Sequence, residues 1–146
     1  MHSPFLAFTC RALASIAIAS PAFAWETPAR GSADRAALMD AIRPTVHSDL
    51  GFPVEFVIDA ARVDGLAAFV MVRPQHPGGR KISFAETLLS PESADFIDTS
   101  LATQALLRRI NSGWSVAAIA IGATDVWWAD PAYCAEFARV IPEVCG

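Results

Sequence analysis

Apolar and polar residues recur along this chain with two different periods. Over 33–50 the apolar residues return every three or four positions, which is the spacing of one helix face. Ser32 is a suitable N-cap, and Gly51 stands where a glycine commonly ends a helix. The pattern therefore predicts one amphipathic helix over Ala33–Leu50.

The residues that follow the helix predict a β-hairpin. Residues 54–74 form two apolar runs around Asp64-Gly65, and this dipeptide is a strong hairpin signal because a type I′ turn needs positive φ at both central residues. The turn would place Ala60 opposite Phe69. We expect the bulky face of the hairpin to pack on the helix; it carries Phe56, Ile58, Phe69 and Met71. The other face is mixed, as in a groove or a subunit contact, and carries Glu55, Val57, Asp59, Val70 and Val72.

A second and more apolar hairpin is predicted within Leu101–Trp128. A three-residue loop, Asn111-Ser112-Gly113 with Gly113 in the left-handed region, would place Leu106 opposite Ala118. We expect the drier face to join the core; it carries Leu101, Ala105, Leu107, Ala117, Ile119 and Ile121. The mixed face carries Gln104, Arg108 and Trp114.

Residues 75–100 between the two hairpins are the least regular part of the chain. Residues 75–81 form a glycine-rich loop in which Arg80 and Lys81 could contact an anion. The strand–loop–helix pattern of a phosphate site is missing, so a solvated loop is the favoured interpretation. Residues 91–98 have the composition of a helical turn.

The end of the chain predicts a short helix over Pro131–Val140, with Pro131 in its first turn. The whole order is then helix, hairpin, irregular crossover, hairpin and C-terminal helix. The economical way to bury these apolar faces is an α+β fold, with the N-terminal helix packed on a curved four-stranded antiparallel sheet.

This order of elements resembles the cystatin-like and NTF2-like group of folds, in which a curved sheet wraps a leading helix. The helix over 35–50, the strand start at 53–57, and Trp114 with the Gly-Ala-Thr-Asp-Val run at 122–126 are also similar to those of small exported proteobacterial proteins of unassigned activity. The resemblance covers most of residues 25–146. Its motifs are structural, so it implies no functional residue.

The first 24 residues have the pattern of a secretory signal peptide. A short apolar run at 12–18 is followed by Ala22-Phe23-Ala24, a small-x-small cleavage signal that predicts cleavage between Ala24 and Trp25. The apolar run is shorter than the ~20 residues needed to cross a bilayer. We therefore expect a periplasmic or secreted protein with a single domain over residues 25–146.

Cys134 and Cys145 are the two cysteines after the predicted cleavage point. An even count in a small exported domain predicts a disulfide. A metal pair or a redox pair is the alternative, but the spacing does not fit a CxxC motif, and no neighbouring histidine suggests zinc. A disulfide would fix the C-terminal tail to the domain.

The charge of the chain narrows the class of partner. The net charge is −4, and loss of the leader with Arg11 makes it one unit more negative. No basic stripe suggests nucleic acid or an anionic membrane surface. No motif predicts a metal or a cofactor, so the expected partner is a protein or a small ligand.

Residues with catalytic chemistry are scattered along the sequence. His47 falls on the polar helix face and His76 lies in a loop, so both are expected to be solvated. Glu55 and Asp59 would stand roughly 13 Å apart along a strand, which is wider than glycosidase carboxyl pairs. Asp125 is the best candidate for a general base in an apolar pocket, although a turn role is favoured for it.

Two functions therefore remain open. The favoured one is a non-catalytic periplasmic binding or interaction domain, including an inhibitor or an immunity-type role, with a homodimer through the sheet as one arrangement. Its candidate binding residues are Gln104 and Arg108 on the mixed face and the aromatic pair Trp127 and Trp128. The alternative is a small isomerase- or hydrolase-type enzyme that uses Asp125 or Asp59 in a sheet-lined pocket.

Overall fold

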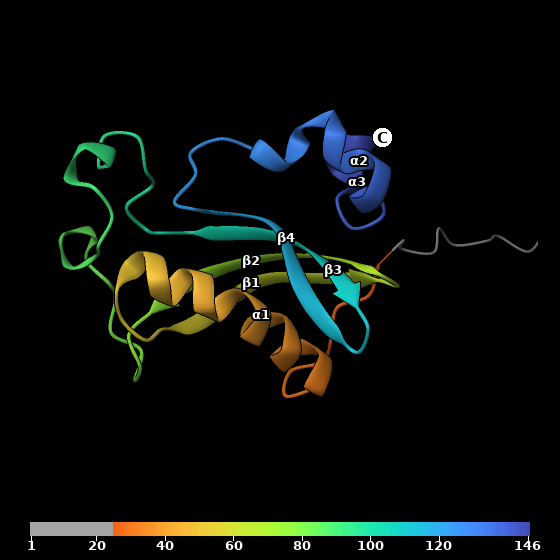
Figure 1. The fold of residues 1–146 in the computed structure, drawn as a ribbon, viewed down its shortest axis with the longest axis horizontal. Helices are drawn as coiled ribbons and strands as arrows, with labels where there is room; N and C mark the ends of the chain where they lie inside the picture. Colours follow the sequence, from red (N-terminus) through yellow and green to blue (C-terminus); the bar gives the residue numbers. More distant parts are fainter. Residues whose placement is uncertain (1–24) are drawn as a thin grey trace, which may run out of the picture.

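The computed structural model describes residues 25–146; the predicted signal peptide and its cleavage point after Ala24 lie outside the described residues. Helix α1 (Ala33–Leu50) leads the chain. One antiparallel sheet follows, formed by β1 (Glu55–Asp64), β2 (Ala67–Gln75), β3 (Thr103–Ile110) and β4 (Gly113–Ile121). The strands lie side by side in chain order, so β1 and β4 form the two edges of the sheet (Figure 1). The predicted α+β class is confirmed.

Helix α1 begins and ends at the predicted residues because both of its caps are local. The Ser32 hydroxyl accepts a hydrogen bond from the Arg35 N–H at 3.2 Å. Gly51 has φ 91° and donates its N–H to the His47 carbonyl at 2.8 Å. A residue with a side chain is strained at such a φ, so glycine suits this position.

The C-terminal segment covers the sheet face opposite α1 (Figure 1). It consists of η3 (Trp127–Ala129), α2 (Pro131–Phe137) and α3 (Pro142–Cys145). The predicted helix over 131–140 is thus shorter than expected and is followed by a second helix. Asp130 caps α2 by accepting the Ala132 N–H at 2.9 Å. The disulfide Cys134–Cys145 joins α2 to α3, as the sequence predicts.

The turn of the first hairpin lies one residue later than predicted. Its two loop residues are Gly65 and Leu66, and Asp64 pairs with Ala67. Gly65 has φ 56°, whereas Leu66 is not in the left-handed region. Positive φ at the first loop position alone is the pattern of a type II′ turn, which favours glycine there. Asp64 stays in β1, where its carboxylate accepts a hydrogen bond from Arg139.

The predicted packing of Phe56 and Ile58 on the α1 side is confirmed. The same prediction is wrong for Phe69 and Met71, because β1 contains a bulge at Asp59. Ala60 pairs with Met71, but Ile58 pairs with Val72, so Asp59 has no partner of its own. Side chains alternate between the two sides of a sheet, and one extra residue therefore moves the start of β1 to the other side. The face of β2 that packs on α1 is the one predicted to be mixed, and Phe69 turns instead toward the C-terminal segment.

The second hairpin agrees with prediction away from its turn and differs near it. Leu106 pairs with Ala118 as predicted, but the loop has only two residues, and Asn111 takes the positive φ of 55° in place of Gly113. A bulge at Ala117 absorbs the difference. Trp114 therefore pairs with Arg109, and its ring lies 4.3 Å from the Arg109 guanidinium carbon instead of beside Arg108.

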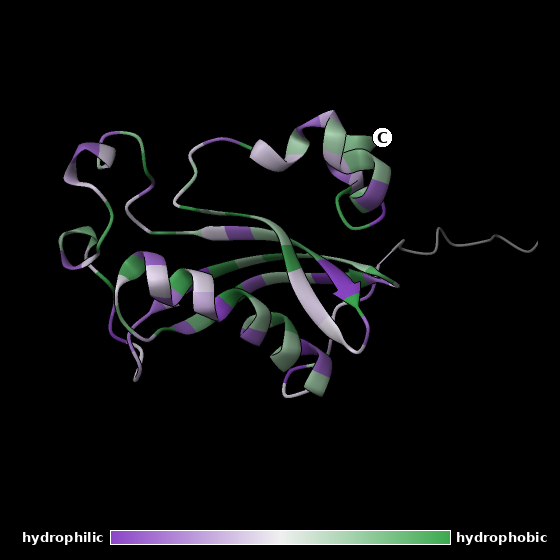
Figure 2. Cartoon of the chain, in the orientation of Figure 1, coloured by the Kyte–Doolittle hydropathy of each residue, from purple (hydrophilic) through white to green (hydrophobic). Residues whose placement is uncertain are grey.

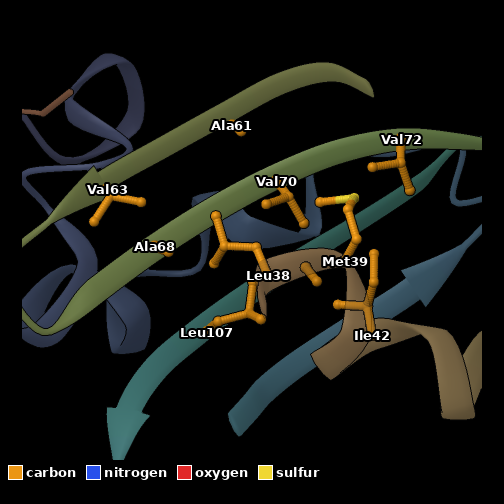
Figure 3. Close-up of a cluster of buried hydrophobic side chains, with 10 residues drawn as sticks. Leu38, Met39, Ile42, Ala61, Val63, Ala68, Val70, Val72 and Leu107 are labelled. Carbon is orange, nitrogen blue, oxygen red and sulfur yellow. The ribbon is translucent and has the colours of Figure 1, made fainter. Parts of the chain in front are cut away.

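The core is divided by the sheet into two layers. On one side α1 packs on all four strands; Figure 3 shows Leu38, Met39 and Ile42 of the helix facing Val63, Val70, Val72 and Leu107. Ala105 also belongs to this layer, so the predicted dry face of the second hairpin is confirmed at Ala105 and Leu107. On the other side, Phe69 and Leu106 pack against Phe137, Val140 and Ile141.

The crossover between the hairpins is irregular, as expected. It contains two short 3₁₀ turns, η1 (Phe84–Glu86) and η2 (Pro91–Ser93), and the latter lies within the predicted helical turn. Within residues 25–146, no helix is both long enough and apolar enough to cross a membrane.

Candidate interaction surface

The predicted aromatic pair packs on the sheet. The ring centroids of Trp127 and Trp128 are 5.9 Å apart in an edge-to-face arrangement, and the Trp128 ring lies 5.4 Å from that of Phe69. Tyr133 lies 5.7 Å from Trp127. Both tryptophans are half-buried, and neither indole N–H has a hydrogen-bond partner. The packing of the two rings holds the C-terminal segment on the sheet. A role of these tryptophans in binding stays a prediction.

Gln104 and Arg108 project from β3 on the side of the C-terminal segment but lie in different surroundings. Gln104 is 5% exposed, and its side-chain oxygen has no partner. Arg108 is half-exposed and donates to both carboxylate oxygens of Glu136 on α2, at 2.9 and 2.8 Å. This bond lowers the pKa of Glu136 and raises that of Arg108. Arg108 therefore fastens α2 to the sheet.

The candidate catalytic carboxylates are not held in apolar pockets. Asp125 is exposed on the loop after β4. Asp59 accepts two hydrogen bonds from Arg73, at 2.9 and 2.8 Å, and these bonds lower the pKa of Asp59 below its ordinary value. A lowered pKa makes a carboxylate a weaker base, so this ion pair opposes a general-base role for Asp59.

His47 and His76, the two histidines with possible catalytic chemistry, have no contact with Asp59 or Asp125 within residues 25–146. His47 is exposed on α1. His76 lies 3.2 Å from the Glu86 carboxylate, and its ring is 4.7 Å from the Phe52 ring. Arg80 and the Ser83 N–H also bond Glu86, at 2.9 Å each. The Ser83 N–H, Arg80 and His76 lower the pKa of Glu86 to about 2. The same contacts hold the loop over 75–81 against η1.

The β1 edge of the sheet carries charges and is partly covered. Four of its ten residues are charged, namely Glu55, Asp59, Arg62 and Asp64. The bulge at Asp59 interrupts the strand, and Glu26 exchanges two backbone hydrogen bonds with Val63, each 2.8 Å long. Charges, bulges and covering segments are the features by which sheet edges avoid pairing with other chains.

The β4 edge has far less of this protection. Its sequence, Gly-Trp-Ser-Val-Ala-Ala-Ile-Ala-Ile, contains no charged residue and no proline. Figure 2 shows no strongly hydrophilic stretch along it. Within residues 25–146, β4 pairs only with β3. Its one interruption is the bulge at Ala117.

Backbone groups on the outer side of β4 have no hydrogen-bond partner within residues 25–146. Gly122 donates its N–H to the Ala102 carbonyl at 2.8 Å, just beyond the end of the strand. Because inward and outward groups alternate along an antiparallel strand, the peptide groups of Ile121 and Ile119 point away from β3. Two exposed apolar side chains lie near in the sequence, Ile110 (50%) at the end of β3 and Val126 (52%) on the loop after β4. The β4 edge is therefore an apolar strand with unpaired hydrogen-bonding groups.

Comparison with protein-family models, with curated proteins and with solved structures found no match for this chain.

Proposed function

We propose that this chain is an exported, non-catalytic interaction domain, and that it binds an extended segment of a partner protein by strand addition at the β4 edge. The observation that carries the proposal is the difference between the two sheet edges: β1 is charged and bridged by Glu26, whereas β4 is neutral and unpaired on its outer side. Strand addition uses such an edge, because the main chain supplies affinity and alternate side chains supply specificity.

The surroundings of β4 define the chemistry of the partner segment. On the α1 side, an added strand would lie beside Trp114, Val116 and Ile119, which pack partly buried against the α1 core layer. On the other side β4 carries small residues, including Ala118 and Ala120. Since no charge on β4 would pair with a charge on the partner, the segment is neutral and rich in β-branched residues.

The compartment and the fold group belong to the same proposal. The leader over 1–24 supports export to the periplasm, where the disulfide Cys134–Cys145 would stay oxidised. A leading helix laid across a four-stranded antiparallel sheet supports a place in the cystatin-like or NTF2-like group. The alternative, an enzyme with an aspartate base, gains no support from Asp125, which is exposed, or from Asp59, which is paired with Arg73.

Peptide selection tests the proposal directly. Random nine-residue peptides displayed on phage are panned against oxidised protein of residues 25–146, and the selected peptides are titrated in solution. We expect neutral, β-branched peptides whose binding shifts the amide NMR signals of β4. Ala118→Lys places a charge on this edge and should weaken binding about tenfold, or roughly 1.4 kcal/mol.

The matched control is Ala60→Lys on β1, because Ala60 has the same intermediate exposure on the other edge strand. It should leave peptide binding unchanged. Failure to select any peptide, or peptides that bind Ala118→Lys as well as the unmodified protein, would contradict the proposal. A stable dimer that Ala118→Lys converts to monomer would also overturn it, since the occupant of β4 would then be a second copy of this chain.

A further inference from the structure

A groove of about 460 Å³ lies at the far end of the sheet from the hairpin turns. Its walls come from the ends of β1 and β2, the loop after β2 and the residues before β3. The lining residues are Val57, Arg73, Pro74, Gln75, Gly79, Lys81, Ile82, Asp98, Thr99 and Ser100. This volume is within the range of small-molecule sites.

Backbone hydrogen bonds fix one wall of this groove. Gln75 and Lys81 form an antiparallel bridge across the loop. Within that loop His76 donates its N–H to the Arg80 carbonyl, and Gly79 donates to the His76 carbonyl, each at 2.9 Å. Gly78 and Gly79 have φ of 86° and 89°, which glycine adopts without strain. The backbone of Lys81 is therefore held at a fixed place on the rim.

The opposite wall is fixed by Asp98. Its N–H donates to the Gly122 carbonyl at 2.7 Å, and its carboxylate accepts the N–H and the hydroxyl of Ser100 at 2.9 and 2.7 Å. These bonds to Ser100 lower the pKa of Asp98. The carboxylate oxygens of Asp98 are thus already occupied by donors of its own loop.

Several donors in the groove have no partner in the protein. Lys81 is the only lysine of the chain, and its ammonium group contacts no carboxylate or carbonyl within residues 25–146. The Gln75 amide and the Thr99 hydroxyl have no hydrogen-bond partner in this described part either. Arg73 gives its Nε and one terminal nitrogen to Asp59 and keeps its other terminal nitrogen free. The groups without a partner are therefore mainly hydrogen-bond donors, and the ammonium group of Lys81 supplies an unpaired positive charge among them.

The remaining lining is apolar and comes from Val57, Pro74 and Ile82. From this combination we propose that the groove binds a small organic monocarboxylate, whose carboxylate group contacts Lys81, Gln75 and Thr99 and whose short aliphatic body covers the apolar wall. The Asp98 carboxylate in the lining disfavours an ion with more than one negative charge, because like charges repel at short range. The site is separate from the β4 edge and does not depend on the proposed function.

Titration of the oxidised protein with hexanoate, followed by amide NMR, tests this site. We expect a dissociation constant on the order of 1 mM or tighter, with the largest shifts at Gly79, Lys81, Thr99 and Ser100. Hexan-1-ol, which has the same aliphatic body and no charge, should bind at least several-fold more weakly. Lys81→Met should weaken hexanoate binding about tenfold, as expected for loss of a charged hydrogen bond.

Arg30→Met is the matched control, because Arg30 is also an exposed cation without a protein partner and lies outside the groove. It should leave hexanoate binding unchanged. The proposal is overturned if hexan-1-ol binds as well as hexanoate, if Lys81→Met and Arg30→Met behave alike, or if inorganic phosphate binds the groove more tightly than hexanoate. Ala118→Lys should not alter hexanoate binding, so failure of the β4 proposal and failure of this one give different results.

Discussion

The two edges of the sheet are built differently, although both belong to hairpins of nearly equal length. β1 carries Asp59 and Arg62, is bulged at Asp59, and receives the Glu26 bridge from the segment that precedes α1. β4 carries no charge, and only the bulge at Ala117 interrupts its ladder with β3. An unprotected edge can pair with other chains, and the proposed strand addition rests on this difference between β1 and β4.

Removal of the disulfide should have the largest effect, because it changes both the stability of the domain and the apolar surface that the domain exposes. The double change Cys134→Ser and Cys145→Ser removes a link that closes a loop of about a dozen residues, and it should lower the free energy of unfolding by about 2–3 kcal/mol in urea denaturation. Loosening of α2 and α3 would uncover Phe69 and Leu106, which pack under them. Binding of a hydrophobic dye should rise, because these two buried side chains would become accessible. An unchanged unfolding midpoint would show that packing alone holds the C-terminal segment.

A change at Asp59 should make the β1 edge more like β4. Asp59→Val removes an exposed ion pair with Arg73, worth about 0–1 kcal/mol, so the fold should persist. Light scattering should nevertheless show more self-association, because a charge that blocks pairing is gone. Asp40→Val on the exposed side of α1 removes the same charge away from the sheet and should not raise scattering. Equal scattering from both variants would mean that net charge, and not the edge, controls association.

A smaller effect concerns the pH range over which the Asp59–Arg73 pair exists. The two Arg73 hydrogen bonds lower the pKa of Asp59 below its ordinary value of 3.8. A carboxylate with a lowered pKa in the folded state stabilises the fold above its ordinary pKa, and this contribution is lost as the pH falls through the lowered value. Carboxyl NMR titration should find the Asp59 midpoint below 3.8 in the unmodified protein. In Arg73→Met the midpoint should rise toward the ordinary value, and an unchanged midpoint would contradict the pairing.

The parts of the fold that depend on local chemistry could be predicted from the sequence. The N-cap Ser32 and the C-terminal Gly51 directly flank the apolar pattern of helix α1, so the sequence near the helix contains both of its end signals. The existence of both hairpins follows from turn residues between apolar runs. The pairing of Cys134 with Cys145 follows from the even count of cysteines after the predicted cleavage point.

The register and the faces could not be predicted, because distant contacts decide them. Asp64 remains in β1 beside Arg139, which lies in the C-terminal segment, and the bulge at Asp59 is stabilised by Arg73 on β2. Neither partner is visible in the local pattern. The sequence therefore placed Phe69 against α1, whereas it packs under Phe137.

The candidate site could be predicted only in part. The sequence drew attention to Trp127, Trp128, Gln104 and Arg108, which lie on the covered side of the sheet. The sequence of β4 is visibly apolar, but its position as an unpaired edge depends on the strand order. The glycine-rich loop over 75–81 is visible in the sequence, but the absence of a partner for Lys81 depends on the folded positions of every carboxylate in the described residues.

Amide hydrogen exchange at β4 tests the central claim most directly. In the free protein the N–H groups of Ile119 and Ile121 should exchange fast, whereas that of Ala120, which points toward β3, should exchange slowly. A selected peptide should slow exchange at Ile119 and Ile121 and leave Ala120 unchanged. Slow exchange at Ile119 and Ile121 in the free protein at low concentration, or no change with a bound peptide, would contradict strand addition at this edge.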